Sequence, residues 1–104
     1  MKKAKVLIQG REAGIFSEII KGSSYEFLYL PEYKGLPVSR TMPVRKQAYA
    51  YDRFPPFFDG LLPEGFQLQS LLKVRKLDED DYFGQLIAVG KDMIGAVTLE
   101  QLND

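Results

Sequence analysis

The sequence contains neither histidine nor cysteine among its 104 residues. Without histidine it lacks the side chain that most often moves protons near neutral pH, and without either residue it lacks the usual partners of an activated nucleophile. The absence of cysteine also excludes disulfides and thiolate metal sites, and it is typical of a reducing compartment. We therefore expect a cytoplasmic protein that is not an enzyme and that holds no metal and no cofactor.

An excess of either charge is also missing, since 14 Lys and Arg residues balance 14 Asp and Glu residues. A neutral chain has no basic surplus with which to hold a phosphate backbone or an anionic membrane. No apolar run approaches the roughly 20 residues of a membrane span. The apolar run within Met1–Gly10 is far too short for a signal peptide. We therefore expect no direct contact with nucleic acid and no membrane partner.

The first half of the chain has the pattern of β-strands. Apolar, β-branched and aromatic residues fill Lys5–Gln9, Ala13–Ile20 and Tyr25–Leu30, and turn residues separate these stretches. We expect a fourth short strand at Val38–Met42. Because prolines flank it on both sides, this strand should lie at an edge of the sheet.

The second half has helical patterns followed by one more strand. Leucines recur at helical spacing in Glu64–Lys76. The acidic run Asp78–Asp81 offers an N-cap to a second helix, for which Gly90 is a natural end. Gly95–Leu99 then reads as a closing strand. This order predicts an α+β fold: a small antiparallel β-sheet covered by two helices of the C-terminal half, with a closing strand.

Three short motifs resemble functional sites but lack the supporting parts. Asp78–Asp81 has adjacent carboxylates without the alternating ligands and turn glycine of a calcium loop. Gly10–Gly14 lacks the lysine and hydroxyl residues of a P-loop. Asp81–Gly84 has a tyrosine inserted into the Asp-Phe-Gly pattern of kinases, and no other kinase motif accompanies it. We expect all three motifs to be structural.

A group of basic residues in the first half has two interpretations. The group consists of Arg40, Arg45 and Lys46. These side chains could contact an acidic partner. The simpler interpretation is a solvated strand end, because exposed charges at strand edges protect against aggregation.

The stretch Phe57–Phe66, FFDGLLPEGF, combines aromatic residues and leucines with chain-bending residues. At about 100° per residue, the helix that follows carries a stripe of three leucines: Leu68, Leu71 and Leu72. Phe66 lies about half a turn away from this stripe. If the leucines face the sheet, Phe66 points away from it, in a first turn that Pro63 and Gly65 shape.

An outward aromatic residue on a rigid turn is suited to anchor an interface. Alternatively, Ala48–Pro56 or Phe57 covers Phe66, and helix geometry alone leaves both arrangements open. The other apolar residues of the stretch are expected in the core, because a small domain needs them: Phe57, Phe58, Leu61 and Leu62.

These residues resemble a known family. Phe57–Gly65 together with Asp80–Leu99 is similar to the N-terminal subdomain of HipA-type serine/threonine kinases, which are toxins of bacterial toxin–antitoxin modules. The subdomain has a Phe-Phe-Asp-x-Leu-Leu-Pro segment, a helix, and a Gly-x-Asp-x-x-Gly-Ala-Val close, which here is Gly90–Val97. Phe27–Pro31 and Ser39–Pro43 resemble two further segments of the family more loosely.

The chain departs from HipA kinases in length, since those continue for several hundred residues that carry the ATP site and the catalytic aspartate. It therefore resembles the HipS-type proteins of three-part HipBST modules, in which the kinase HipT lacks this subdomain. The resemblance implies an antitoxin that binds and inhibits a HipT-type kinase, with a HipB-type partner supplying DNA binding. We expect residues 1–104 to form a single domain of this kind.

We expect the partner-binding residues to be Pro63, Glu64, Gly65 and Phe66, in a turn that reaches toward the active-site cleft of the kinase. Phe66 would be an apolar plug and Glu64 a partner for basic kinase residues. Two alternatives stay open. The chain could be a structural or activating subunit that completes a HipA-like kinase, or it could be an N-terminal fragment of a longer HipA toxin.

Overall fold

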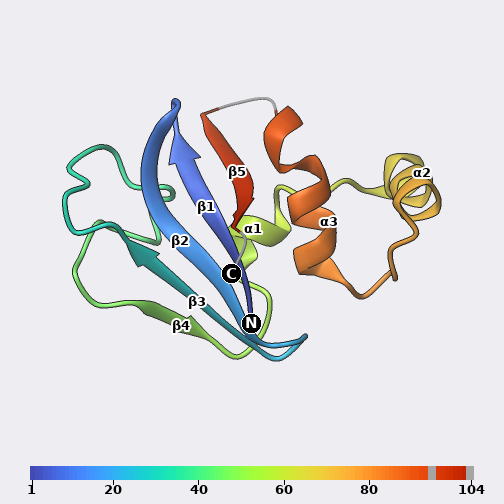
Figure 1. Ribbon diagram of the computed structural model, residues 1–104, viewed down its shortest axis with the longest axis horizontal. Helices are drawn as coiled ribbons and strands as arrows, with labels where there is room; N and C mark the ends of the chain where they lie inside the picture. Colours follow the sequence, from blue (N-terminus) through green and yellow to red (C-terminus); the bar gives the residue numbers. More distant parts are fainter. Residues whose placement is uncertain (94–95, 103–104) are drawn as a thin grey trace.

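A computed structural model describes residues 1–93 and 96–102, which form a five-stranded antiparallel sheet accompanied by three α-helices (Figure 1). The strand order across the sheet is β4-β3-β2-β1-β5. The elements in chain order are β1 (Lys2–Ile8), β2 (Arg11–Ile20), β3 (Ser24–Tyr29), β4 (Tyr49–Tyr51), α1 (Pro56–Asp59), α2 (Gly65–Arg75), α3 (Tyr82–Val89), the 3₁₀ turn η1 (Gly90–Asp92) and β5 (Val97–Leu102). The α+β class predicted from the sequence is confirmed.

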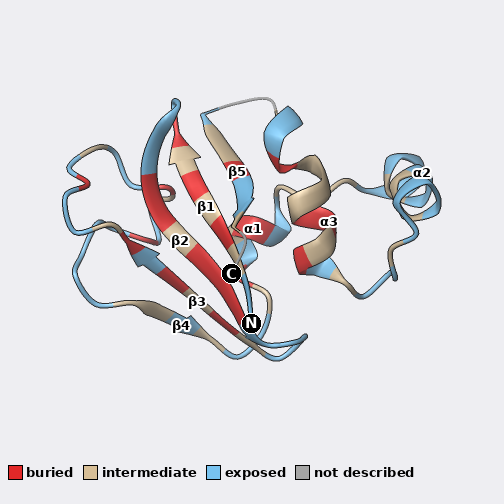
Figure 2. Cartoon of the chain, in the orientation of Figure 1, coloured by how far each residue is buried: buried red, intermediate tan, exposed pale blue. Residues whose placement is uncertain are grey.

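One face of the sheet carries the core, as the alternation in the strands requires. Ala4, Phe16 and Phe27 lie side by side in register across β1, β2 and β3, and all three are fully buried. Helices α1 and α3 cover this face. The Phe16 ring lies 4.2 Å from the Phe58 ring of α1 and 5.3 Å from the Phe83 ring of α3, measured between centroids. Figure 2 shows the buried residues concentrated in the central strands, α1 and α3.

Tyr25 sits at the margin of this aromatic core. Its ring lies 5.9 Å from that of Phe16, and only 2% of the residue is exposed. Burial, together with the carboxylate of Glu18, raises the pKa of the Tyr25 hydroxyl to about 12. The phenol therefore stays neutral in the folded protein at pH values where an exposed tyrosine ionises.

The prediction of a strand at Val38–Met42 is wrong. This segment belongs to a long loop between β3 and β4, and its two buried ends bond to one side chain instead of to a neighbouring strand. The Tyr29 hydroxyl accepts a hydrogen bond from the Val38 amide at 2.9 Å and donates one to the Met42 carbonyl. The edge strand is Tyr49–Tyr51, which pairs with β3.

The closing strand predicted at Gly95–Leu99 is found as β5, paired with β1, although Ile94 and Gly95 lie outside the described residues. Gly90 ends α3 as expected, but it keeps a right-handed φ of −57°. Glycine is required at this position because of close packing, since a Cβ there would lie 2.8 Å from the Leu99 carbonyl oxygen. Within the described ranges, no helix has the length and apolar character needed to cross a bilayer.

Candidate partner-binding site

The stretch FFDGLL forms the anchor of the candidate site. Pro56 opens the short helix α1, where its missing N–H costs nothing. Phe58 is fully buried against Phe16, as the sequence predicts. Phe57, Leu61 and Leu62 are partly buried and pack against the same core. The segment before Pro63 is thus fixed to the body of the protein.

After this anchor the chain turns outward through Pro63, Glu64 and Gly65. Glu64 is exposed, extended at φ −129°, and occupies the N-cap position of α2 without a side-chain capping bond. Gly65 has a φ of +56°, which a residue with a Cβ adopts only at a cost of about 1 kcal/mol or more. An ideal Cβ on Gly65 would meet no atom within 4 Å, so the backbone conformation is what requires glycine here.

Helix α2 projects from the body of the protein. It has no buried residue and packs beside α3, on the side away from the sheet (Figure 1). In Figure 2 the ribbon of α2 is drawn as exposed or intermediate along its whole length. Phe66, at its second position, has 87% of its surface exposed. Of the two arrangements left open by the sequence, the outward Phe66 is the one found.

The outward position of Phe66 was predicted on the condition that the leucine stripe of α2 faces the sheet, and this condition is not met. Leu68, Leu71 and Leu72 are partly buried, but none belongs to the set of side chains packed on the core. Instead α3 lies between α2 and the sheet, and α2 packs mainly against α3. The helical period placed Phe66 opposite the leucines correctly, but it could not identify what the leucines would contact.

Val74 is a second exposed apolar residue of α2 that the sequence reasoning missed, and it lies near the C-terminal end of the helix, away from the turn Pro63–Phe66. It is 76% exposed. Eight residues separate it from Phe66, which at 100° per residue places the two side chains about 80° apart around α2. The same period places Val74 only about 60° from Leu71, at the border of the leucine stripe, so the period alone did not mark Val74 as an outward residue.

The charged residues at the two ends of α2 have opposite signs, and each sign is the one that the helix dipole favours at that end. Glu64 lies at the positive end of the helix dipole, and the last turn carries Lys73 and Arg75 at the negative end. The start of α2 thus presents an acidic and an aromatic group, and its end presents basic groups. The four predicted site residues, Pro63 to Phe66, are contiguous at the first of these two ends.

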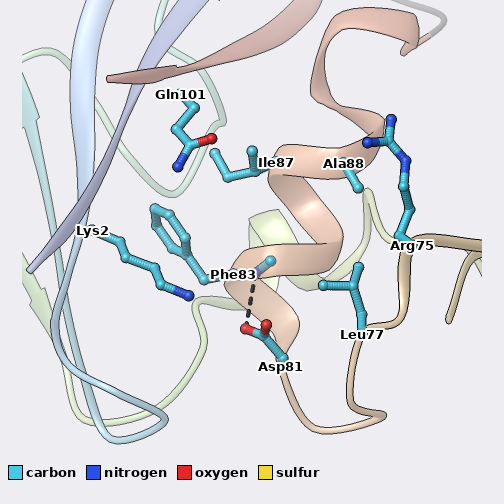
Figure 3. A pocket seen from close by; sticks show the side chains of 9 residues that line it. Lys2, Arg75, Leu77, Asp81, Phe83, Ile87, Ala88 and Gln101 are labelled. Atoms are coloured by element: carbon cyan, nitrogen blue, oxygen red, sulfur yellow. Dashed lines mark hydrogen bonds between the residues drawn. The ribbon is translucent and has the colours of Figure 1, made fainter. Parts of the chain in front are cut away.

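A small cavity lies at the base of α2. It has a volume of about 240 Å³, and Figure 3 shows its lining, which comes from β1, β5, α3, the end of α2 and the segment between α2 and α3: Lys2, Arg75, Leu77, Asp81, Phe83, Gly84, Ile87, Ala88 and Gln101. Small-molecule sites commonly have volumes of about 300–1,000 Å³. The cavity is smaller than these, and its one acidic lining residue, Asp81, is already engaged in capping α3.

Asp81 and Phe83, from two of the three lookalike motifs, have structural roles, as predicted. Asp81 is the N-cap of α3, and its Oδ1 accepts a hydrogen bond from the Gly84 amide at 3.0 Å (Figure 3). Phe83 is buried in the core. The segment Gly10–Gly14 is the end of the β1–β2 turn and the start of β2. Within residues 1–93 and 96–102 no group of three or more acidic side chains could hold a metal ion.

Comparisons with known proteins agree along almost the whole chain. A family model described as the HipA N-terminal domain matches residues 4–100. An uncharacterized protein of Haemophilus influenzae is 31% identical over 101 residues, which are 97% of this chain and 93% of that protein. Y4mE of Sinorhizobium fredii, named as a proposed kinase, is 30% identical in an alignment of 93 residues that covers 86% of this chain.

A solved structure titled "N-terminal domain of HipA toxin" superimposes with a TM-score of 0.78 and 29% identity, over 100% of this chain and 95% of that chain. The chain spans only 22% of the length of Y4mE, in contrast to 93% of the Haemophilus protein. The same unit therefore occurs as nearly all of a small protein and as a minor part of a longer one.

Proposed function

The chain belongs to the HipA N-terminal domain family, and we propose that it is an antitoxin that binds and inhibits a HipT-type serine/threonine kinase of a bacterial toxin–antitoxin module. The family relationship connects the chain to HipA-related toxin–antitoxin proteins. The inhibitory role is the step that goes beyond this relationship. We further propose that residues 1–104 form a single domain with no catalytic activity of its own.

The observation that carries the proposal is the exposure of Phe66. An aromatic residue that is 87% exposed on a helix without buried residues contributes little to folding. It offers instead a large apolar contact, and residues of this kind commonly anchor interfaces when a partner buries them. The rigid entry through Pro63 and the left-handed Gly65 fixes the direction in which Phe66 projects.

The turn from Pro63 to Phe66 is proposed to reach the active-site cleft of the kinase. There Phe66 fills an apolar part of the cleft and excludes substrate or nucleotide. Glu64 is exposed and lacks a capping bond, so its carboxylate is available to pair with basic residues of the kinase. A HipB-type protein is proposed to supply DNA binding in the larger complex, because this chain has no net positive charge.

The test is a kinase assay with a purified HipT-type kinase and this chain. Autophosphorylation of the kinase is measured alone, with the wild-type chain, and with Phe66→Asp. A matched variant, Val74→Asp, places the same charge on another exposed apolar position of α2. We expect inhibition by the wild-type chain and by Val74→Asp, and loss of inhibition with Phe66→Asp. Equal inhibition by both variants would exclude the plug, and absence of any inhibition would exclude the antitoxin role.

A second candidate is a structural or activating subunit. It is favoured by Y4mE, in which the matching unit is 22% of a longer protein named as a proposed kinase. In that arrangement the unit is a covalent part of the longer chain, and a separate copy would complete a kinase that lacks it. The sign of the change in autophosphorylation on adding the chain distinguishes the two, because completion raises the rate and inhibition lowers it.

A further inference from the structure

The loop between β3 and β4 forms a groove at the end of the molecule opposite α2. The two regions lie at opposite ends of the longest axis, which spans 39 Å (Figure 1). The groove has a volume of about 500 Å³, and its lining comes from β3 and from the loop: Leu28, Tyr29, Leu30, Pro31, Tyr33, Lys34, Val44, Arg45 and Lys46. This volume lies within the range of about 300–1,000 Å³ that is common for ligand sites.

The groove is preformed, although its loop has no regular secondary structure. Three tyrosine hydroxyls hold the loop by hydrogen bonds to its backbone. Tyr29 contacts both Val38 and Met42, Tyr33 donates to the Leu36 carbonyl at 2.5 Å, and Tyr49 donates to the Pro43 carbonyl at 2.5 Å. A ligand that binds here does not have to order the loop first, so little conformational entropy is lost on binding.

Arg45 is also held in place. Its guanidinium lies 3.7 Å from the centroid of the Tyr49 ring, and its Nε and Nη2 atoms donate to the carbonyls of Gln47 and Ala48, both at 3.1 Å. The side chain therefore stands at the rim as a fixed positive charge. This arrangement replaces the solvated strand end predicted for the basic residues, because no strand forms at Val38–Met42.

The lining combines apolar atoms with charge of one sign. Leu28 and Val44 are 38% and 39% exposed, so part of each apolar side chain is accessible to a ligand in the groove. The charged residues among those that line the groove are all basic: Lys34, Arg45 and Lys46. An apolar floor with a basic rim is complementary to a bulky apolar side chain flanked by carboxylates.

A nucleic acid fits this lining less well. Single strands bind where bases can stack on exposed aromatic rings. The tyrosines of the groove, Tyr29 and Tyr33, are stacked on each other with centroids 5.9 Å apart and are 3% and 7% exposed. Their faces are therefore not available to a base, and the accessible part of the floor is aliphatic.

We propose that this groove binds an acidic peptide segment of a partner protein, with one apolar side chain of the segment on Leu28 and Val44 and its carboxylates at Lys34, Arg45 and Lys46. The site is independent of the kinase surface on α2 and does not rest on the inhibitory role. Because the two surfaces lie at opposite ends of the long axis, one chain can hold two partners at the same time.

The test is a titration of the isotopically labelled chain with a synthetic peptide, followed through its backbone amide NMR signals. The probe has one leucine flanked on each side by two glutamates, within a glycine and serine background. A second peptide carries glutamines in place of the glutamates. We expect shifts confined to residues 28–34 and 44–46 with the glutamate peptide, and at least tenfold weaker binding of the glutamine peptide, because four charges are lost.

Charge reversal on the protein gives the matched control. The double variant Lys34→Glu, Lys46→Glu should weaken binding of the glutamate peptide at least tenfold, whereas Lys73→Glu, Lys76→Glu on α2 should leave it unchanged. All four lysines are exposed, so the groove variant should keep the wild-type melting temperature, whereas the α2 variant should melt slightly lower because its two carboxylates oppose the helix dipole. The alternative ligand is represented by a ten-residue oligothymidine.

Four results would overturn the proposal. The first is no shift at up to about 1 mM peptide, a concentration that half-fills even a weak site with a Kd of this value. The second is equal binding of the glutamine peptide. The third is a set of shifts centred on α2, and the fourth is tighter binding of the oligothymidine at the same residues.

Discussion

Phe66→Ala should weaken binding to the kinase without weakening the fold, and Phe58→Ala serves as the comparison for the free energy of unfolding. Phe66 is 87% exposed, so truncation removes almost no buried surface from the folded chain. Alanine is also the better helix former, by a few tenths of a kcal/mol. We expect the free energy of unfolding to change by less than about 0.5 kcal/mol. Phe58 is fully buried against Phe16, and Phe58→Ala should cost about 3–5 kcal/mol through lost burial and a cavity.

For binding to the kinase, in contrast to folding, Phe66→Ala should have a large effect. Full burial of a phenylalanine side chain contributes about 1.5–3 kcal/mol, and nearly all of the Phe66 surface is still available to be buried. Loss of about 2 kcal/mol raises Kd about thirtyfold. Unfolding is measured by urea denaturation with circular dichroism, and Kd by titration calorimetry against a HipT-type kinase. Unchanged affinity for Phe66→Ala, or destabilisation as large as that of Phe58→Ala, would refute the reasoning.

Three further predictions concern the fold that presents this surface. Tyr25 ionises near pH 10 when unfolded and near pH 12 when folded. In denaturation measured at several pH values, the free energy of unfolding of the wild type minus that of Tyr25→Phe should therefore be constant below pH 10 and fall between pH 10 and 12. A constant difference up to pH 12 would contradict the burial of this phenol. Asp81→Ala should cost about 1 kcal/mol in urea denaturation through loss of the cap on Gly84, whereas the exposed neighbour variant Asp80→Ala should cost less than about 0.5 kcal/mol; equal costs would argue against the cap. Tyr29→Phe leaves the Val38 amide and the Met42 carbonyl without their hydrogen-bond partner. The free energy of unfolding should fall by about 1–3 kcal/mol, and amide hydrogen exchange should become faster in the β3–β4 loop but not in α3. Unchanged exchange in the loop would show that the hydroxyl does not hold the loop.

The sequence by itself determined the features that depend on neighbours along the chain. Alternation with a period of two identified β1, β2 and β3, because adjacent side chains of a strand point to opposite faces. The start of α3 was predictable because the cap joins Asp81 to an amide only three residues away. The helical period, which is a local property of α2, placed Phe66 about half a turn from the leucine stripe, but it left open whether another segment covers Phe66.

The tertiary structure alone decided which distant segments meet. Val38–Met42 has the composition of a strand, but the Tyr29 hydroxyl bonds the amide of one end and the carbonyl of the other, and Tyr49–Tyr51 takes the edge beside β3. The leucines of α2 could pack against a sheet or against a helix equally well. Because α3 lies between α2 and the sheet, these leucines lie away from the sheet. Such choices are set by competition among contacts far apart in sequence, and no local period encodes that competition.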